Sequence, residues 1–362
     1  MRSRSRLWLV GAVALLGVLC LAAAAILKWA VLPSQAMVPS DQNTTRDFGG
    51  NAKVLLNPQA LNSGDLRSIL VVNTPVTATH HVKVLATSGD VAQVQDTRTL
   101  TTSNGQAVGS TQATYAVNRK TLEATSDHPS GWQVNPAKGL TVSWPLGAKK
   151  QDYTGWVPET QTTTTLKYVK QETTQGLTAY VYQTSTQPAQ IKDPQVLNVL
   201  PKALPVSVLR ALAPVLPLSP AVKAQLAALL PRLTQPVPLS YTYQLNATYW
   251  VEPTTGIVLN TQREEIRNAG LSLPGGTVAG GFPVFDVTNA FTSASVNNAV
   301  SDAKDKKSTI DLLSTTLPLI LLIIGILALV AAILMFLLLR RHAGGREHAT
   351  AGAGAAPGAA TD

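Results

Sequence analysis

The stretch SYTYQLNATYWVEPTTGIVLNTQREEI (240–266) decides the fold, because its side chains alternate with a period of two residues. Apolar and aromatic residues occupy every second position, at Tyr241, Tyr243, Leu245, Ala247, Tyr249 and Val251. The intervening positions are mostly polar, a pattern typical of a strand with one buried face. Turn-forming residues follow at 252–256, and the alternation resumes at Ile257 and Leu259. The stretch therefore predicts a long β-hairpin.

Further strand signals extend outward from this hairpin. Runs rich in Val, Thr and Tyr, separated by Asn, Ser, Gly and Asp turn signals, occur at 66–76, 82–86, 91–100 and 112–118. A second hairpin is predicted within 164–183 with its turn at 174–176, and the Gly- and Pro-rich residues 268–286 predict a loop. The expected fold class is α+β: an antiparallel β-rich domain with a cluster of short helices, flanked by two transmembrane helices.

Two apolar segments are long enough to cross a membrane. Leu7–Leu27 and Leu317–Leu339 carry no charged residue, and at about 1.5 Å per residue each matches a hydrocarbon core of about 30 Å. Arginines precede the first segment and follow the second, so the positive-inside rule predicts that both chain ends are cytoplasmic. A cleaved signal peptide is the alternative for the first segment. Its apolar core exceeds the usual length of about 7–15 residues, which favours an uncleaved anchor.

These assignments divide the chain into five parts. They are a basic cytoplasmic tail (1–6), a transmembrane helix (7–27), an extracytoplasmic β-rich domain (28–310), a second transmembrane helix (317–339) and a disordered cytoplasmic tail (340–362). Within the domain, 194–233 is predicted to form a helical cluster. Helical spacing also predicts a juxtamembrane helix over 288–311, with Thr288 as its N-cap.

The segment VLPKALPVSVLRALAPVLPLSPAVKAQLAALLPRL (199–233) is apolar and cationic, with no acidic residue. Its prolines exclude a third membrane span, since the longest proline-free run is 221–230 and a span needs about 20 residues. They instead predict short helices at about 194–200, 205–213 and 220–230. The leucines either form the core of a small helical subdomain or face a lipid, for which the cations would suit anionic headgroups. The candidate lipid-binding residues are Leu204, Leu209, Leu212, Leu216, Leu226, Leu229, Arg210 and Lys223.

Composition and motifs argue against several classes of function. Charged residues make up 14% of the chain, against roughly 25% in ordinary soluble domains, and the net charge of +9 shows no nucleic-acid-binding pattern. Cys20 is the single cysteine and lies in the first apolar segment, so the domain has no disulfide. The neighbours His80 and His81 point to opposite faces of a strand, as do Glu264 and Glu265. The sequence predicts no catalytic residue, no cofactor, no metal site and no enzymatic activity.

The chain resembles a known family at several points along its length. The matching pieces are WPLGAKKQDYTGW (144–156), GLTAY (176–180), YWVEPTTGIVL (249–259) and LPLILLIIGILALV (317–330), together with the N-terminal anchor. They are similar to the actinobacterial membrane family labelled porin PorA-like, a domain of unknown function. The resemblance implies a cell-envelope protein of a high-GC Gram-positive bacterium and supplies no activity. The Thr- and Gln-rich strands are those of a water-facing domain rather than of a transmembrane barrel.

The order of segments is also similar to that of class B scavenger receptors. That likeness implies two terminal spans, a β-rich ectodomain with a lipid tunnel, and an apical helical cluster, here 199–233. The leading functional hypothesis is therefore binding or transfer of a lipid or other hydrophobic envelope molecule. The alternatives are a porin or channel component, which would need an oligomer, and a non-enzymatic scaffold for envelope assembly. The expected partners are the membrane and a lipid ligand, and the oligomeric state stays open.

Overall fold

The computed structural model describes residues 2–31, 37–57, 60, 65, 68–214, 220–273, 276–277 and 281–347. The chain separates into two compact units. One unit lies between residues 37 and 307, and the other combines the segments before and after it. Each unit is described by itself below.

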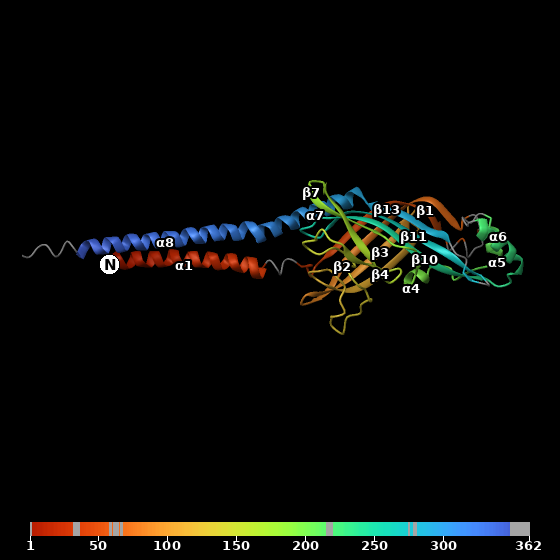
Figure 1. The fold of residues 1–362 in the computed structure, drawn as a ribbon, viewed down its shortest axis with the longest axis horizontal. Coiled ribbons are helices and arrows are strands. Elements are labelled where there is room, and N and C mark those ends of the chain that lie inside the picture. The colour runs from red at the N-terminus through yellow and green to blue at the C-terminus, as the bar shows by residue number, and fades with distance from the viewer. Residues whose placement is uncertain are drawn as a thin grey trace, which may run out of the picture. The chain divides into compact units, whose positions relative to one another are not determined.

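The unit 37–307 is built on one antiparallel sheet (Figure 1). Its main strands are β1 (Asn43–Leu56), β2 (Leu70–Ser88), β3 (Val91–Thr102), β4 (Ala107–Asn118), β5 (Tyr153–Val157), β6 (Thr162–Thr174), β7 (Leu177–Ser185), β10 (Val237–Val251), β11 (Val258–Leu273) and β13 (Phe282–Phe291). They lie in the order β4-β3-β2-β1-β13-β11-β10-β7-β6-β5, with the short strands β8 (Ala189–Gln190), β9 (Ala203–Leu204) and β12 (Gly276–Thr277) at the side of this path. The predicted α+β class is confirmed.

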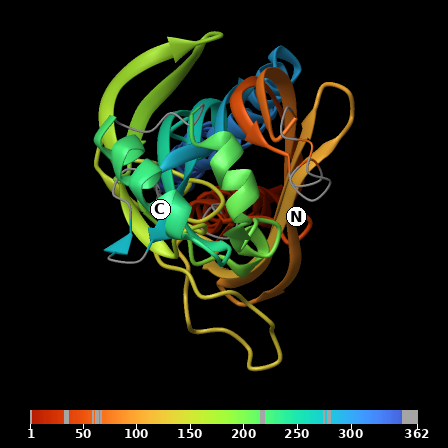
Figure 2. The same cartoon turned by 90° about the vertical axis from the view of Figure 1, so that its right-hand side faces the viewer.

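The sheet curls into a half-barrel, as the end-on view shows (Figure 2). Its two edge strands, β4 and β5, are linked by isolated backbone bridges through the connecting segment. Val117 of β4 pairs with Ala124, Glu123 pairs with Leu140, and Leu140 pairs in turn with Gly155 of β5. Backbone pairing therefore covers part of both edges, which limits the exposed donors and acceptors that make edge strands prone to aggregation.

The hairpin predicted from 240–266 is confirmed as β10 and β11. Tyr249 lies opposite Thr261, and the register continues without a shift to Leu239 opposite Leu271. The turn between the strands includes Gly256, which has a φ of 70°. A Cβ atom added there would lie 2.4 Å from the carbonyl oxygen of Trp144, so only glycine fits this turn. The second predicted hairpin is also confirmed, as β6 and β7.

Two strands extend beyond the sequence prediction. The first strand, β1, carries no strong alternation and was not singled out. The residues predicted as a loop, 268–286, instead lengthen β11 to Leu273 and begin β13 at Phe282. Both strands lie between β2 and β10, so their neighbours supply hydrogen bonds on each side. This pairing overrides the weak local preference of a Gly- and Pro-containing sequence.

Three short helices lie at one end of the sheet, and α7 lies at the opposite end (Figure 1). The short helices are α4 (Pro194–Leu197), α5 (Val206–Leu212) and α6 (Pro220–Leu229), close to the predicted bounds. The Asp193 side chain caps α4 by accepting from the Gln195 N–H. The helix predicted for 288–311 begins later, as α7 (Ser293–Asp311), because Thr288–Phe291 completes β13. The cap is Thr292, whose hydroxyl accepts from Ser295 N, and not Thr288.

The second unit contains two long apolar helices. They are α1 (Arg2–Ile26), followed by the π-helical turn η1 (Leu27–Val31), and α8 (Leu317–Glu347), preceded by the π-helical turn η3 (Leu312–Thr316). Both contain segments long and apolar enough to cross a membrane. The helices pack closely at Gly17 and Gly325, where a Cβ added to Gly325 would lie 2.9 Å from Leu21. Small residues that permit such an approach are typical of helix pairs in membranes.

Candidate functional site

The leucines predicted to bind lipid lie mostly in the core of the unit. Leu204, Leu209, Leu212 and Leu226 are buried in one apolar cluster with residues of β10, β11 and β13, and Leu229 is partly buried against it. Leu216 lies outside the described residues. Of the two predicted cations, Arg210 is exposed and donates to the Leu230 carbonyl, and the partly buried Lys223 donates to the Pro214 carbonyl. The core reading of these leucines therefore holds in this structure.

The space among these leucines is very small. A cavity of about 10 Å³ is lined by Leu204, Leu212, Tyr241, Phe282 and their neighbours. That volume is at the limit for a single water molecule. The Tyr241 hydroxyl at its edge already donates to the Pro201 carbonyl at 2.6 Å. In the conformation described, the helical cluster closes one end of the sheet without leaving room for an acyl chain.

A larger cavity, of about 100 Å³, lies inside the curled sheet. Its walls combine apolar residues with charged residues from β2, β3, β11, β13 and α4. The lining includes Leu100, Val108, Val196, Val199, Phe285, His80, Arg98, Glu159, Arg263, Glu265, Arg267 and Asn289. Residues far apart in the sequence thus form one mixed polar and apolar site.

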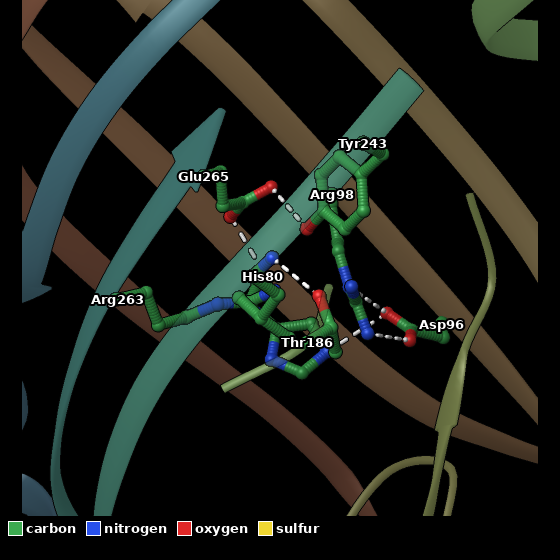
Figure 3. A network of polar contacts seen from close by, with 8 residues as sticks. His80, Asp96, Arg98, Thr186, Tyr243, Arg263 and Glu265 are labelled. Atoms are coloured by element: carbon green, nitrogen blue, oxygen red, sulfur yellow. Dashed lines mark hydrogen bonds and ion pairs between the residues drawn. The ribbon is translucent and has the colours of Figure 1, made fainter. Parts of the chain in front are cut away.

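One side of this site is a charged trio on β2 and β3 (Figure 3). The Asp96 carboxylate lies 2.8 Å from Arg98 Nη2 and 2.8 Å from His80 Nε2. Asp96 is 4% exposed, so burial by itself favours its protonated form, but Arg98 and His80 hold its pKa well below the usual range. The β2–β3 pairing sets His80 opposite Arg98, which brings the three side chains to one face.

The facing side is formed by β10 and β11. Glu265 accepts a hydrogen bond from the Tyr243 hydroxyl at 3.0 Å and lies 3.3 Å from Arg263 Nη2 (Figure 3). Burial opposes ionisation of Glu265, but Arg263, Arg267 and Arg98 lower its pKa. Burial also raises the pKa of Tyr243. Glu265 is therefore the anion of this side and Tyr243 a neutral donor.

Glu159, in the turn after β5, is the second carboxyl group of the cavity. Its backbone carbonyl accepts from the N–H groups of Lys192 and Asp193, which fixes the turn against the start of α4. Burial, and next the negative charge of Glu265, raise the pKa of the Glu159 side chain against the opposing effect of arginines. The two carboxyl groups of one interior thus have pKa values shifted in opposite directions, because only Glu265 has an ion-pair partner.

The approach to the cavity passes between β4 and α4. Val199, after α4, lines the cavity and is 56% exposed. Gln195 attaches α4 to the edge of β4, because its side-chain oxygen accepts from Gln112 N at 2.9 Å and its amide donates to Gln112 O at 2.8 Å. This pair of bonds imitates one further step of the sheet, so α4 covers the β4 edge where the cavity opens.

Sequence reasoning identified parts of this site and not the whole. The prediction that neighbouring His80 and His81 face apart is confirmed, since His81 contacts Asn43 on the other face. The same holds for Glu264, which pairs with Lys53 while Glu265 lies inside. The signal that was missed is the register of the 240–266 hairpin, which sets Arg263 and Glu265 opposite the inward-facing Ala247 and Leu245. Among the described residues, no three His, Cys, Asp or Glu are grouped to hold a metal ion.

Comparison with solved structures finds only remote likenesses. A crystal structure described as a "putative MaoC domain protein dehydratase from Chloroflexus aurantiacus J-10-fl" is 11% identical, with 76% of this chain and 81% of that chain covered and a TM-score of 0.13. A second structure, described as a MaoC-like dehydratase, is also 11% identical, with 71% and 81% covered and a TM-score of 0.12. Scores this low carry no argument about fold or activity. None of the curated proteins matches the sequence.

Comparison with family models gives an extended match. The model described as Porin PorA matches residues 10–334, which include the first apolar helix, the whole β-rich unit and most of the second apolar helix. The two apolar helices fit a membrane protein. The chain belongs to the Porin PorA family.

Proposed function

We propose that this protein is a non-enzymatic envelope protein, anchored in the membrane by two helices, that binds or transfers a lipid or other hydrophobic envelope molecule. The binding site in this proposal is the cavity inside the sheet, rather than the leucine cluster of α5 and α6. Both chain ends are cytoplasmic and the unit 37–307 is extracytoplasmic, as the flanking arginines predict.

The mixed lining of the cavity is the observation that supports this function. Leu100, Val108 and Phe285 give it an apolar wall, and Val199 extends apolar surface to its exposed mouth. Apolar pockets with a few converging polar groups are typical of ligand sites. A volume of about 100 Å³ suits one end of an amphipathic molecule, since a cavity of about 150 Å³ holds benzene.

The proposal is tested by the molecules that remain bound to the purified protein. The full chain is extracted with mild detergent, transferred to nanodiscs of defined lipid, and its organic extract is analysed by mass spectrometry. Val108→Trp fills the cavity, and Val169→Trp, at a 45% exposed position of β6, is the matched control. We expect a retained molecule in the wild type and in the control, and its loss in V108W. Equal retention in V108W, or no bound molecule in the wild type, contradicts the proposal.

The orientation has its own test. Ser103 lies in the exposed turn between β3 and β4, and Cys20 is the single natural cysteine. In a Cys20→Ser background, Ser103→Cys should react with a membrane-impermeant maleimide added outside intact protoplasts. Labelling only after the membrane is opened would refute the extracytoplasmic location.

A channel component is the second candidate, favoured by the family and by the charged interior of the sheet. Two helices do not enclose a pore, so this function requires several copies of the chain. It predicts stepwise conductance when the purified protein is added to planar bilayers, with an ion selectivity that changes in Arg267→Gln. Absence of conductance at concentrations that saturate reconstitution would leave the binding function as the better account.

A further inference from the structure

The inner face of β11 holds two arginines with unsatisfied donors. The buried Nε atoms of Arg263 and Arg267 have no hydrogen-bond partner in the described part of the chain. Arg263 pairs with Glu265 through its Nη2. The Arg267 guanidinium instead lies over the Phe285 ring, 4.2 Å from its centroid. Buried N–H groups without acceptors destabilise a fold unless another molecule supplies the acceptor.

A third polar group points to the same place. Asn289 of β13 is paired with Arg263 of β11 in the sheet register and lines the same cavity. Its side-chain oxygen is buried and also has no partner among the residues the structure describes. An amide carries both donors and acceptors, so Asn289 offers a donor when its side chain turns over. Three unsatisfied polar side chains on two adjacent strands therefore surround one space.

The charges around this space are unequal. Arg98, Arg263 and Arg267 carry three positive charges, and the ionised Asp96 and Glu265 carry two negative charges. Glu159 is the remaining carboxyl group here, and burial and the charge of Glu265 raise its pKa. When Glu159 is protonated, the interior has one uncompensated positive charge. An anion of single charge would balance it, and a planar guanidinium matches the oxygens of a carboxylate or phosphate.

We propose that the polar end of the sheet cavity binds an oxyanion group, a carboxylate or a phosphate, between Arg263, Arg267 and Asn289. The inference rests on the proposed function in one respect: the oxyanion is the head of an amphipathic ligand whose apolar part lies against Leu100 and Val108. Free phosphate has the same chemistry without the apolar part. The ligand class is thus an anionic amphiphile, in contrast to a neutral lipid.

The first experiment compares matched probes on the full chain in phosphatidylcholine nanodiscs, by calorimetry, with empty nanodiscs as the blank. The probes are octanoate, octanol and inorganic phosphate. We expect octanoate to bind at least tenfold more tightly than octanol, because a charge-assisted pair with arginine is lost in the alcohol. Phosphate that binds and competes with octanoate identifies the oxyanion as sufficient. Octanoate binding without phosphate binding shows that the apolar part is also needed.

The second experiment changes the charges. Arg267→Gln should weaken octanoate binding about tenfold or more, and Arg232→Gln, at an exposed position away from the cavity, should leave it unchanged. Because R267Q could fail to fold, Glu159→Gln provides a change in the opposite direction. It removes a competing carboxyl group, so E159Q should bind octanoate at least as tightly as the wild type. Folding of each variant is checked by its thermal transition.

The outcomes separate the two proposals. Equal binding of octanoate and octanol, unchanged binding in R267Q, or weaker binding in E159Q overturns the oxyanion site while leaving lipid binding intact. Phosphate binding that depends on Arg267, in a protein that retains no lipid, supports the oxyanion site and contradicts the lipid function. No retained lipid together with no binding of any probe overturns both.

Discussion

Removal of the Asp96 charge is the perturbation that most directly tests the buried network. Asp96 is 4% exposed and lies within 2.8 Å of both Arg98 and His80. Asp96→Asn keeps the shape and leaves the Arg98 guanidinium without its counter-charge in the sheet interior. Breaking a buried pair in this way costs about 3–5 kcal/mol. We expect the lower figure, about 3 kcal/mol, because Arg98 keeps 25% of its side chain exposed and can be partly hydrated.

The assay is thermal unfolding of the full chain in detergent, followed by near-UV circular dichroism. A domain of this size changes its transition temperature by about 2–4 °C per kcal/mol, so D96N should unfold about 6–12 °C lower than the wild type. The control is Asp90→Asn, which removes a 2.7 Å ion pair with Lys120 whose two side chains are about half exposed. Such surface pairs contribute about 0–1 kcal/mol, so D90N should change little.

Two results would refute the reasoning. One is a D96N transition within 1–2 °C of that of D90N, since 1 kcal/mol is worth about 2–4 °C. The other is a double variant, D96N with Arg98→Met, that is no more stable than D96N alone, because removing the stranded cation should recover stability. The effect also has a defined pH dependence. The folded pKa of Asp96 is lowered, so its contribution is complete above the unfolded value of about 3.9 and is lost as pH falls through the folded pKa.

Three further substitutions test the packing. Leu209→Ala should destabilise the unit by about 2–5 kcal/mol in the same thermal assay, because Leu209 is fully buried in α5. Gly256→Ala should destabilise it by at least about 1–2 kcal/mol, since its φ is 70° and the new Cβ would lie 2.4 Å from a carbonyl oxygen. Gly325→Leu should weaken association of the separately expressed apolar helices, measured by energy transfer in detergent, whereas Gly11→Leu, with no atom within 4 Å of its Cβ, should not.

Periodic patterns explain why much of the fold could be predicted. A half-buried strand needs a period of two, and the 240–266 stretch keeps this period through both halves of its hairpin. The prolines of 199–233 exclude a long helix, because proline lacks the N–H that a helix needs, and they mark the starts of α4 and α6. The two apolar helices follow from their lengths alone.

The predictions failed where neighbouring strands decide the local structure. The β1 strand and the 268–273 extension of β11 have little pattern of their own, and pairing on both sides supplies their hydrogen bonds. The same pairing turned Thr288–Phe291 from the expected start of a helix into the end of β13. Local propensity is a fraction of a kcal/mol per residue, and tertiary contacts override it.

The sequence by itself determined the α+β class, the two apolar helices, the family resemblance and the opposed directions of His80 and His81. Only the tertiary structure brought Arg98, Arg263 and Arg267 into one interior, because their strands are neighbours in space through register and curvature that no local pattern encodes. It also turned the leucines of α5 and α6 towards the core. Apolar residues on a short helix specify burial and not the partner that buries them, and packing against β10, β11 and β13 made that choice.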